Sequence, residues 1–315
     1  MSGFGIVVNP QAGGNRRVAD RTERLATLVG NDGVVREADR LEQLVEVARE
    51  FRDRGIDILG LCGGDGSFFR ALSAVAEVYG PDPLPVFLPL RAGTMNTVAR
   101  GVGAPRGRPE RVVERLVGQR RRGEALPTSA RQLLRVNGTL LGFMVGAGVI
   151  VGFLQAYYGG RVQGPVGAAQ LLAKLAMSAL NGGRFVKAVF DWVDADVRCD
   201  GDRVPFGRFS VIYASTIKDI GLGFRPTYRA SDELGRFHLL AGPLGAVETV
   251  RCLPRIHRGL PTESSRLYDR VARRVVVEFR QPKPYMIDGD VMNPVSGFGI
   301  EAGPVLQVVT ENVAR

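Results

Sequence analysis

Cysteine is scarce in this sequence. The 315 residues contain three cysteines, at positions 62, 199 and 252. They are odd in number, far apart and without a CxxC pair, which excludes a disulfide framework and a zinc site built on paired cysteines. We therefore expect a protein of the reducing cytoplasm. No basic segment precedes the first apolar stretch, at residues 4–9, so we expect no secretory signal.

A hydrophobic run long enough to cross a membrane is also lacking. Residues 140–154 are apolar without interruption, but a membrane helix needs about 20 such residues. Glycine occupies positions 142, 146, 148 and 152 of this stretch, and its GxGxxxG spacing does not fit the dinucleotide-binding fingerprint. We expect a buried strand and turn here.

Lysine is rare, so arginine supplies nearly all of the positive charge. Lysine occurs only at positions 174, 187, 218 and 283, whereas the formal net charge is +10. Such a charge attracts nucleic acid, anionic lipid or a polyphosphate. The arginine clusters at residues 106–122 and 251–274 are not interleaved with aromatic residues, and no known nucleic-acid-binding motif is present. We therefore expect no nucleic-acid partner.

The length and the order of the elements indicate two domains. A chain of 315 residues exceeds one ordinary core, and 45% apolar with 23% charged residues is the balance of a globular protein. Up to about residue 125, strand-like and helix-like segments alternate, which is typical of an α/β layer with a parallel sheet. The expected strands are 4–9, 56–62 and 85–90, and the expected helices are 16–29, 41–51, 68–79 and one from about 96.

Beyond residue 125 the pattern changes to short strands separated by turn signals. We expect an amphipathic helix within residues 105–127 and strands at 131–136, 185–192 and 209–214. Residues 166–180 predict a second amphipathic helix, with Gln170 and Lys174 on one face and an opposite side that packs or touches lipid.

Three glycine-containing loops lie where an expected strand ends and a helix begins. They are Asn9-Pro10-Gln11-Ala12-Gly13-Gly14, Gly63-Gly64-Asp65-Gly66-Ser67 and Pro89-Leu90-Arg91-Ala92-Gly93-Thr94-Met95-Asn96. Glycine lets backbone N–H groups approach phosphate oxygens, and a helix N-terminus adds partial positive charge. The loops therefore indicate a phosphate cradle. It is not a Walker P-loop, because GxxxxGKS/T does not occur, and the protein-kinase motifs are missing as well.

Together and in this order, the loops resemble the catalytic domain of the diacylglycerol kinase family, which includes sphingosine kinases and bacterial lipid kinases. Ile287-Asp288-Gly289-Asp290 is similar to the DGE motif of that family, with aspartate in place of glutamate. GGDG alone is shared with NAD kinases and phosphofructokinases, so the NPxxG and GTxN motifs narrow the resemblance. It implies an α/β nucleotide-binding domain of residues 1–124 plus 296–315, a mostly antiparallel, β-sandwich-like lipid-binding domain of residues 125–295, and an active site in the cleft between them.

The resemblance also implies an ATP-dependent lipid kinase that uses Mg²⁺. Asp65 would hold the metal, Asp288 would be the general base on the acceptor hydroxyl, and Asp290 would assist. The expected nucleotide-binding residues are Asn9, Pro10, Gly13, Gly63, Gly64, Gly66, Ser67, Gly93, Thr94 and Asn96. The alternative role of Asp65 is to cap the helix that follows it in the chain. Without the resemblance, Asp288-Gly289 would be an ordinary hairpin turn. Arg16 and Arg17 either pair with phosphate or face solvent.

Some positions depart from the pattern of the family. Thr97 stands where an aspartate is usual, Phe69-Arg70 replaces an Asn-Glu pair, and residues 231–235 replace an Asp-Gly of the second domain. Two alternatives therefore stay open: a kinase of a soluble acceptor such as NAD, and a nucleotide- or lipid-binding regulator without turnover. For the leading interpretation we expect peripheral, reversible association with the inner membrane face. The oligomeric state is left open, with a homodimer as one option.

Overall fold

The computed structural model describes residues 3–160, 162 and 164–311. The chain divides into two compact units. Unit 1 comprises residues 1–131, 139–141 and 305–315, and unit 2 comprises residues 132–138 and 142–304. The first change of unit, after residue 131, and the last, after residue 304, fall inside strands, and both come later in the chain than the expected boundaries near residues 125 and 296.

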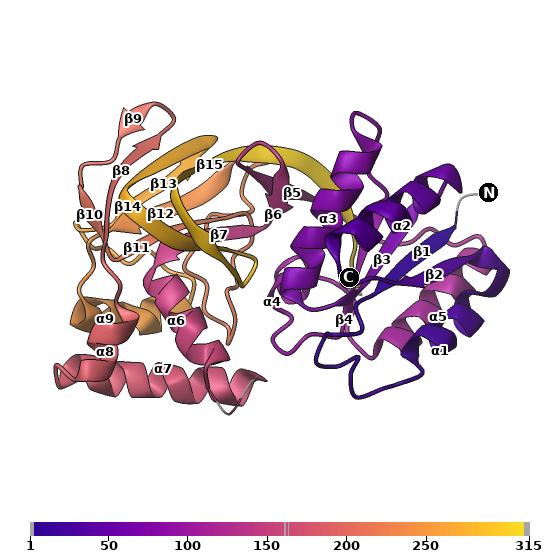
Figure 1. Cartoon of the computed structure of the whole chain (residues 1–315), viewed down its shortest axis with the longest axis horizontal. Helices are drawn as coiled ribbons and strands as arrows, with labels where there is room; N and C mark the ends of the chain where they lie inside the picture. The colour runs from indigo at the N-terminus through magenta and orange to yellow at the C-terminus, as the bar shows by residue number, and fades with distance from the viewer. Residues whose placement is uncertain (1–2, 161, 163, 312–315) are drawn as a thin grey trace. The chain divides into compact units, whose positions relative to one another are not determined.

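Unit 1 is built on a parallel sheet. Its strands are β1 (Phe4–Val8), β2 (Gly33–Glu37), β3 (Ile58–Gly63) and β4 (Val86–Arg91), in the spatial order β2-β1-β3-β4 (Figure 1). The end of the long strand β15 (Asp290–Val309) adds to β4 in parallel, with Val308 opposite Phe87. The parallel sheet expected from the alternating pattern is confirmed.

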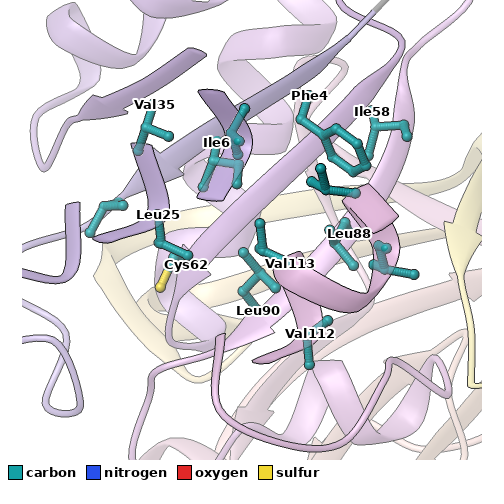
Figure 2. Close-up of a cluster of buried hydrophobic side chains, with 14 of the residues drawn as sticks. Phe4, Ile6, Leu25, Val35, Ile58, Cys62, Leu88, Leu90, Val112 and Val113 are labelled. Atoms are coloured by element: carbon teal, nitrogen blue, oxygen red, sulfur yellow. The ribbon is translucent and has the colours of Figure 1, made fainter. Parts of the chain in front are cut away.

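Helices cover both faces of this sheet. The helices are α1 (Arg21–Val29), α2 (Leu41–Asp53), α3 (Asp65–Tyr79), α4 (Thr97–Gly101) and α5 (Pro109–Arg121), with a 3₁₀ turn at Gly30–Asp32. On one face, Leu25 of α1 and Val112 and Val113 of α5 pack on Ile6 and Leu88 of the sheet (Figure 2). On the other face α2 lies against α3, and the Phe68 ring of α3 meets the Phe87 ring of β4 edge to face, with the ring centroids 5.7 Å apart.

Two local expectations in unit 1 were wrong. Strand β2 was missed, because its five residues, GVVRE, are too few to show a clear period beside the neighbouring helices. Helix α1 begins at Arg21, five residues after the expected start at Arg16. The preceding residues are held in a loop by the side chain of Asn15, as described below.

Unit 2 is mainly antiparallel. Its strands are the remainder of β5 (Thr128–Val136), β7 (Met144–Gly148), β8 (Val193–Cys199), β9 (Asp202–Arg203), β10 (Arg208–Phe209), β11 (Val211–Ser215), β12 (Phe237–Gly242), β13 (Tyr268–Ala272), β14 (Arg274–Ile287) and most of β15. The short strand β6 (Leu140–Gly142) belongs to unit 1 except for its last residue. The order β13-β12-β11-β7-β14-β15 forms the main sheet, and β8 pairs with β14.

Four helices gather beside these strands: α6 (Val149–Tyr158), α7 (Gly164–Leu180), α8 (Arg184–Val189) and α9 (Ala246–His257) (Figure 1). The expected helix at 166–180 is confirmed, but the expected strand at 185–192 was wrong, because residues 184–189 form α8. Val186 and Val189 of α8 are buried against the other helices, and this packing overrides the β-branched composition. Residues 140–154 form β6, β7 and the start of α6, so the expected strand ends in a helix. Among the described residues, no helix combines the length and the apolar content needed to cross a membrane.

Candidate functional site

The three glycine loops follow β1, β3 and β4, which lie side by side in unit 1. Val8 is paired with Cys62, and Cys62 with Leu90, so the three strands end at one edge of the sheet. The carboxyl edge of a parallel sheet is the place where α/β proteins bind ligands. The loops expected from the sequence therefore converge.

Hydrogen bonds of the first loop attach it to both of the others. The Asn9 side chain donates to Ser67 Oγ at 2.7 Å and accepts from the backbone N–H of Gln11 at 2.8 Å. The backbone N–H of Gly14 donates to the Ala92 carbonyl at 2.8 Å. Asn9 thus orders the cradle from within, and its contact with a nucleotide stays a prediction. Pro10 lies next to it in the same loop.

The second and third loops touch backbone to backbone. The Ala92 N–H donates to the Gly63 carbonyl at 3.1 Å. A Cβ atom on Gly93 would lie 2.4 Å from Cα of Gly64, a distance that real Cβ atoms essentially never show. A Cβ on Gly13 would lie 3.2 Å from the Thr94 hydroxyl. Glycine is therefore required at position 93 for the two loops to meet, independently of any ligand.

Asn96 closes the third loop on itself. Its backbone is left-handed, with φ 52°, a conformation that asparagine tolerates better than most residues. Its side chain accepts the Gly93 N–H and donates to the Gly93 carbonyl, both at 2.9 Å. Thr94, between them, is exposed. The GTxN spacing thus encodes a closed turn that presents Thr94 outward.

Asp65 joins two helix starts. It is the first residue of α3, after Gly64 at the N-cap, and Gly66 and Ser67 complete the first turn. The Asp65 carboxylate accepts the backbone N–H of Thr97 at 2.9 Å and of Val98 at 2.8 Å. The carboxylate thus caps α4, whereas the alternative interpretation of the sequence was a cap of α3, the helix that Asp65 begins.

The sequence around α4 explains part of the departure at Thr97. Thr97 is buried, 5% exposed, and its backbone N–H is bound to the Asp65 carboxylate. An aspartate there would bring a second carboxylate to the first one in a buried position.

The other departures from the family pattern lie in α3 and in unit 2. Phe69 is buried in α3, 3% exposed, while Arg70 is exposed. Asp232 in unit 2 is ion-paired with Lys218 at 3.2 Å.

Asp288 and Asp290 lie in unit 2. Asp288 and Gly289 form the two-residue turn between β14 and β15, with φ of 47° and 91°. Two positive φ angles match the type I′ hairpin turn that Asp-Gly favours. The Asp288 carboxylate is fully buried and accepts the backbone N–H groups of Phe143 and Met144 at 2.9 and 2.8 Å. Asp290 is the first residue of β15 and is half-buried.

Sequence reasoning missed two features of the cradle. Asn15 is buried and donates to the carbonyls of Asn9 and Cys62, at 2.7 and 2.9 Å, while its own oxygen accepts from Arg21. It fastens the first loop to the end of β3. An asparagine following a glycine pair at a strand end is the only sequence signal for this role.

The second missed feature is an arginine cluster beside the third loop. Burial, then the nearby charges of Arg106 and Arg100, hold the pKa of Arg91 below its ordinary value. Nε of Arg91 and Nε and Nη2 of Arg100 are buried and find no hydrogen-bond partner among the described residues. Buried guanidinium nitrogens without acceptors favour a nearby anion. The flanking Arg16 and Arg17 are exposed instead, with Arg16 bound to the Gln11 carbonyl.

No metal cluster built from protein side chains is evident. In the part of the chain that the structure describes, no three histidine, cysteine, aspartate or glutamate residues are grouped so that they could hold a metal ion. A divalent cation at Asp65 would therefore take its other ligands from phosphate oxygens and water, which is the usual arrangement for Mg²⁺ bound with a nucleotide.

Known proteins were compared with the chain by sequence and by structure. Residues 4–126 match the model of the diacylglycerol kinase catalytic domain. No curated protein matches the sequence. A solved structure of a diacylglycerol kinase from Bacillus anthracis strain Sterne is 14% identical, with a TM-score of 0.67 over 100% of this chain and 98% of that one.

Two further structures from the same strain, provisionally named diacylglycerol kinases, are also 14% identical, each with a TM-score of 0.70 over 100% of this chain. They are covered over 98% and 99% of their own lengths. At this identity the likeness is one of fold, and it extends to both units. Residues 4–126 thus match the diacylglycerol kinase catalytic domain, and the resemblance drawn from the motifs is confirmed.

Proposed function

We propose that this chain is an ATP-dependent lipid kinase that transfers the γ-phosphoryl group of ATP to a hydroxyl of diacylglycerol or a related lipid alcohol. The observation that carries the proposal is the meeting of three glycine loops at one edge of the sheet, with the Gly64 and Gly93 backbones in contact. Phosphoryl transfer depends almost entirely on positioning and charge neutralisation, which such a cradle supplies.

In this proposal the loops hold the phosphates. Helix α3 starts at Asp65 and runs for 15 residues, so its first N–H groups and its dipole favour an anion at this end. Gly13, Gly63 and Gly64 let backbone N–H groups approach the phosphate oxygens, and Thr94 offers an exposed hydroxyl. Arg91, at the start of the third loop, has a partly buried guanidinium without enough acceptors and adds positive charge to this loop.

Magnesium fits this site through Asp65. An ionised carboxylate is a ligand that Mg²⁺ prefers, and the Asp65 carboxylate lies at the start of both α3 and α4. When bound, Mg²⁺ would neutralise the charge that develops on the transferred group. Asp65 would orient the metal, and its bonds to Thr97 and Val98 fix the carboxylate for that purpose.

Asp288 is the proposed general base. A base must accept the proton of the attacking hydroxyl within hydrogen-bond distance. Two backbone N–H groups at 2.8 and 2.9 Å hold one carboxylate oxygen in place, which preserves its orientation while it accepts a proton. Asp290, two residues later, would assist in orienting the acceptor.

The proposal is tested by incubating the full chain with radiolabelled ATP, Mg²⁺ and a total lipid extract, with the labelled product identified by mass. We expect a phosphorylated lipid whose formation is abolished by EDTA and lost in Asp288→Asn, while circular dichroism of the variant is unchanged. Preferred labelling of a water-soluble acceptor would instead support the NAD kinase-like alternative. Tight ATP binding without transfer to any acceptor would identify a regulator and refute the kinase proposal.

A further inference from the structure

Helix α7 of unit 2 has one covered and one uncovered side. Leu175 and Ala179 are buried in a cluster with Val186, Val189 and Phe190. The helix contacts α6, α8 and α9, and Figure 1 shows these three helices on the same side of it within unit 2. Its opposite side is therefore not covered by the neighbouring helices of its own unit.

The uncovered side is apolar. Val166, Met177 and Leu180 are 64%, 63% and 63% exposed, and Ala169 and Ala173 between them are exposed as well. Steps of three and four residues place these five positions on one stripe of the helix. We call these five residues the α7 stripe. It carries no polar side chain, and Gln170 and Lys174 lie along its edge.

Exposed apolar residues are concentrated around this stripe. Of the ten large hydrophobic residues that are exposed in the described chain, five fall between residues 158 and 180. The five are Tyr158, Val162, Val166, Met177 and Leu180. Scattered exposed apolar residues need no explanation, but a contiguous group marks a surface that is covered in use.

The charged residues of the segment that carries the stripe have one sign. No aspartate or glutamate occurs from residue 125 to residue 190, although the chain contains 32 acidic residues. The same segment carries Lys174, which lies 4.3 Å from the Phe185 ring, and the exposed Arg184 and Lys187 of the adjacent helix α8. An apolar stripe beside Lys174, Arg184 and Lys187, on a segment without acidic residues, is complementary to an anionic lipid surface.

We propose that the α7 stripe is the surface by which this protein docks on anionic bilayers, with Val166, Met177 and Leu180 inserted among the headgroups. The proposal deepens the proposed lipid-kinase function and rests on it for the identity of the substrate. A second copy of the chain is a poorer occupant, because two acid-free surfaces would bring like charges together.

One of the exposed apolar residues near the α7 stripe contacts the turn that carries Asp288. The Tyr158 hydroxyl, at the end of α6, donates to the Gly289 carbonyl at 2.8 Å. Residue 158 is thus shared by the exposed apolar group and the hairpin turn.

The test is co-sedimentation of the full chain with two kinds of vesicle. One is phosphatidylcholine alone, and the other also contains about 30 mol% phosphatidylglycerol, an anionic lipid. The variant is Met177→Asp. The matched control is Leu41→Asp, which makes the same charge change at a residue 54% exposed on helix α2 of unit 1. Both variants alter exposed side chains, and thermal unfolding followed by circular dichroism checks that both fold.

We expect the parent chain and Leu41→Asp to bind anionic vesicles, with binding weakened by salt. Partitioning of Met177→Asp should fall on the order of tenfold, because a charge replaces an inserted apolar side chain. Replacing Lys174 and Lys187 by glutamine should lower it by about fivefold for each lysine. Phosphorylation of a short-chain, monomeric lipid alcohol should be the same in Met177→Asp and the parent.

Equal vesicle binding by Met177→Asp and the parent would overturn the proposal. A second result would also overturn it: the parent forms a dimer in light scattering, Met177→Asp is monomeric, and neither protein binds vesicles. The stripe would then be an interface between two copies of the chain. If no acceptor is phosphorylated but the vesicle results hold, the docking surface stands and the kinase function fails. The two proposals are therefore distinguishable.

Discussion

Gly93 is the position where one methyl group should separate the loops of the cradle. In Gly93→Ala, the new Cβ would lie 2.4 Å from Cα of Gly64, whereas ordinary contact begins at 3.4 Å. The second and third loops must therefore move apart by about 1 Å, since both partners at this contact are backbone atoms that cannot swing aside. The strain should lower the free energy of unfolding by about 1–3 kcal/mol.

The same displacement should be larger in its effect on activity than on stability. A misplacement of about 1 Å in a positioning element can cost on the order of 100-fold in rate. We expect kcat/KM for ATP to fall by about that factor, and calorimetric ATP binding to weaken, at a temperature where circular dichroism shows the variant folded. The matched control is Gly299→Ala in β15, where no atom lies within 4 Å of the added Cβ.

Unchanged activity and unchanged denaturant stability in Gly93→Ala would refute the reasoning, because the loops would then not need their present contact. A loss of stability with full kcat/KM in the folded fraction would show that the contact is structural only. If Gly299→Ala lost as much activity as Gly93→Ala, the effect would not be specific to the cradle.

Three further predictions concern single side chains. Asp288→Ala should lower the free energy of unfolding by about 2–4 kcal/mol, since two buried N–H groups lose their acceptor. Asp288→Asn should lower it less, because asparagine can still accept these bonds and tolerates φ 47°. Denaturant titration measures both variants, and equal stability of Asp288→Ala and the parent would contradict the assigned bonds. Thr97→Asp should make thermal stability depend on Mg²⁺, because a second carboxylate meets Asp65 at a position only 5% exposed and the two repel each other unless a cation lies between them. Melting curves with and without Mg²⁺ test this, with Thr97→Asn as the uncharged control. Burial raises the pKa of the Cys62 thiol to about 12 from an ordinary value of 9.0. Between these pH values the unfolded chain loses a proton that the folded chain keeps, so the free energy of unfolding should fall as pH rises, by about 1.4 kcal/mol per pH unit. Denaturant unfolding at pH 8 and pH 10 should show a smaller loss of stability in Cys62→Ala than in the parent.

Much of unit 1 could be predicted from the sequence. Buried parallel strands are nearly continuous apolar runs, as at Phe4–Val8 and Ile58–Gly63, and Asn9-Pro10 and Gly63-Gly64 mark where these two strands end. Because parallel strands end at one edge, the loops after them had to converge once the sheet was recognised. The motif order then led to the family that residues 4–126 match.

Other elements were decided by tertiary packing. Residues 184–189 have a composition that suits a strand, yet Val186 and Val189 are buried between helices and the segment is α8. Strand β2 is too short for its own period to identify it, and it forms because β1 offers a free edge. In such segments the intrinsic preference for helix or strand is no larger than the energy of a few side-chain contacts, so the tertiary contacts decide which element forms.

The sequence by itself determined the parallel α/β layer, the three glycine loops and the family, because apolar runs, glycine pairs and motif order are local signals. Only the tertiary structure decided that Asp65 caps α4, that Asn15 fastens the first loop, and that Gly64 and Gly93 meet. These are contacts between residues 30 or more positions apart in most cases, as for Asp65 with Thr97 and Asn15 with Cys62. No local pattern records such contacts, since they exist only after the strands have been placed side by side.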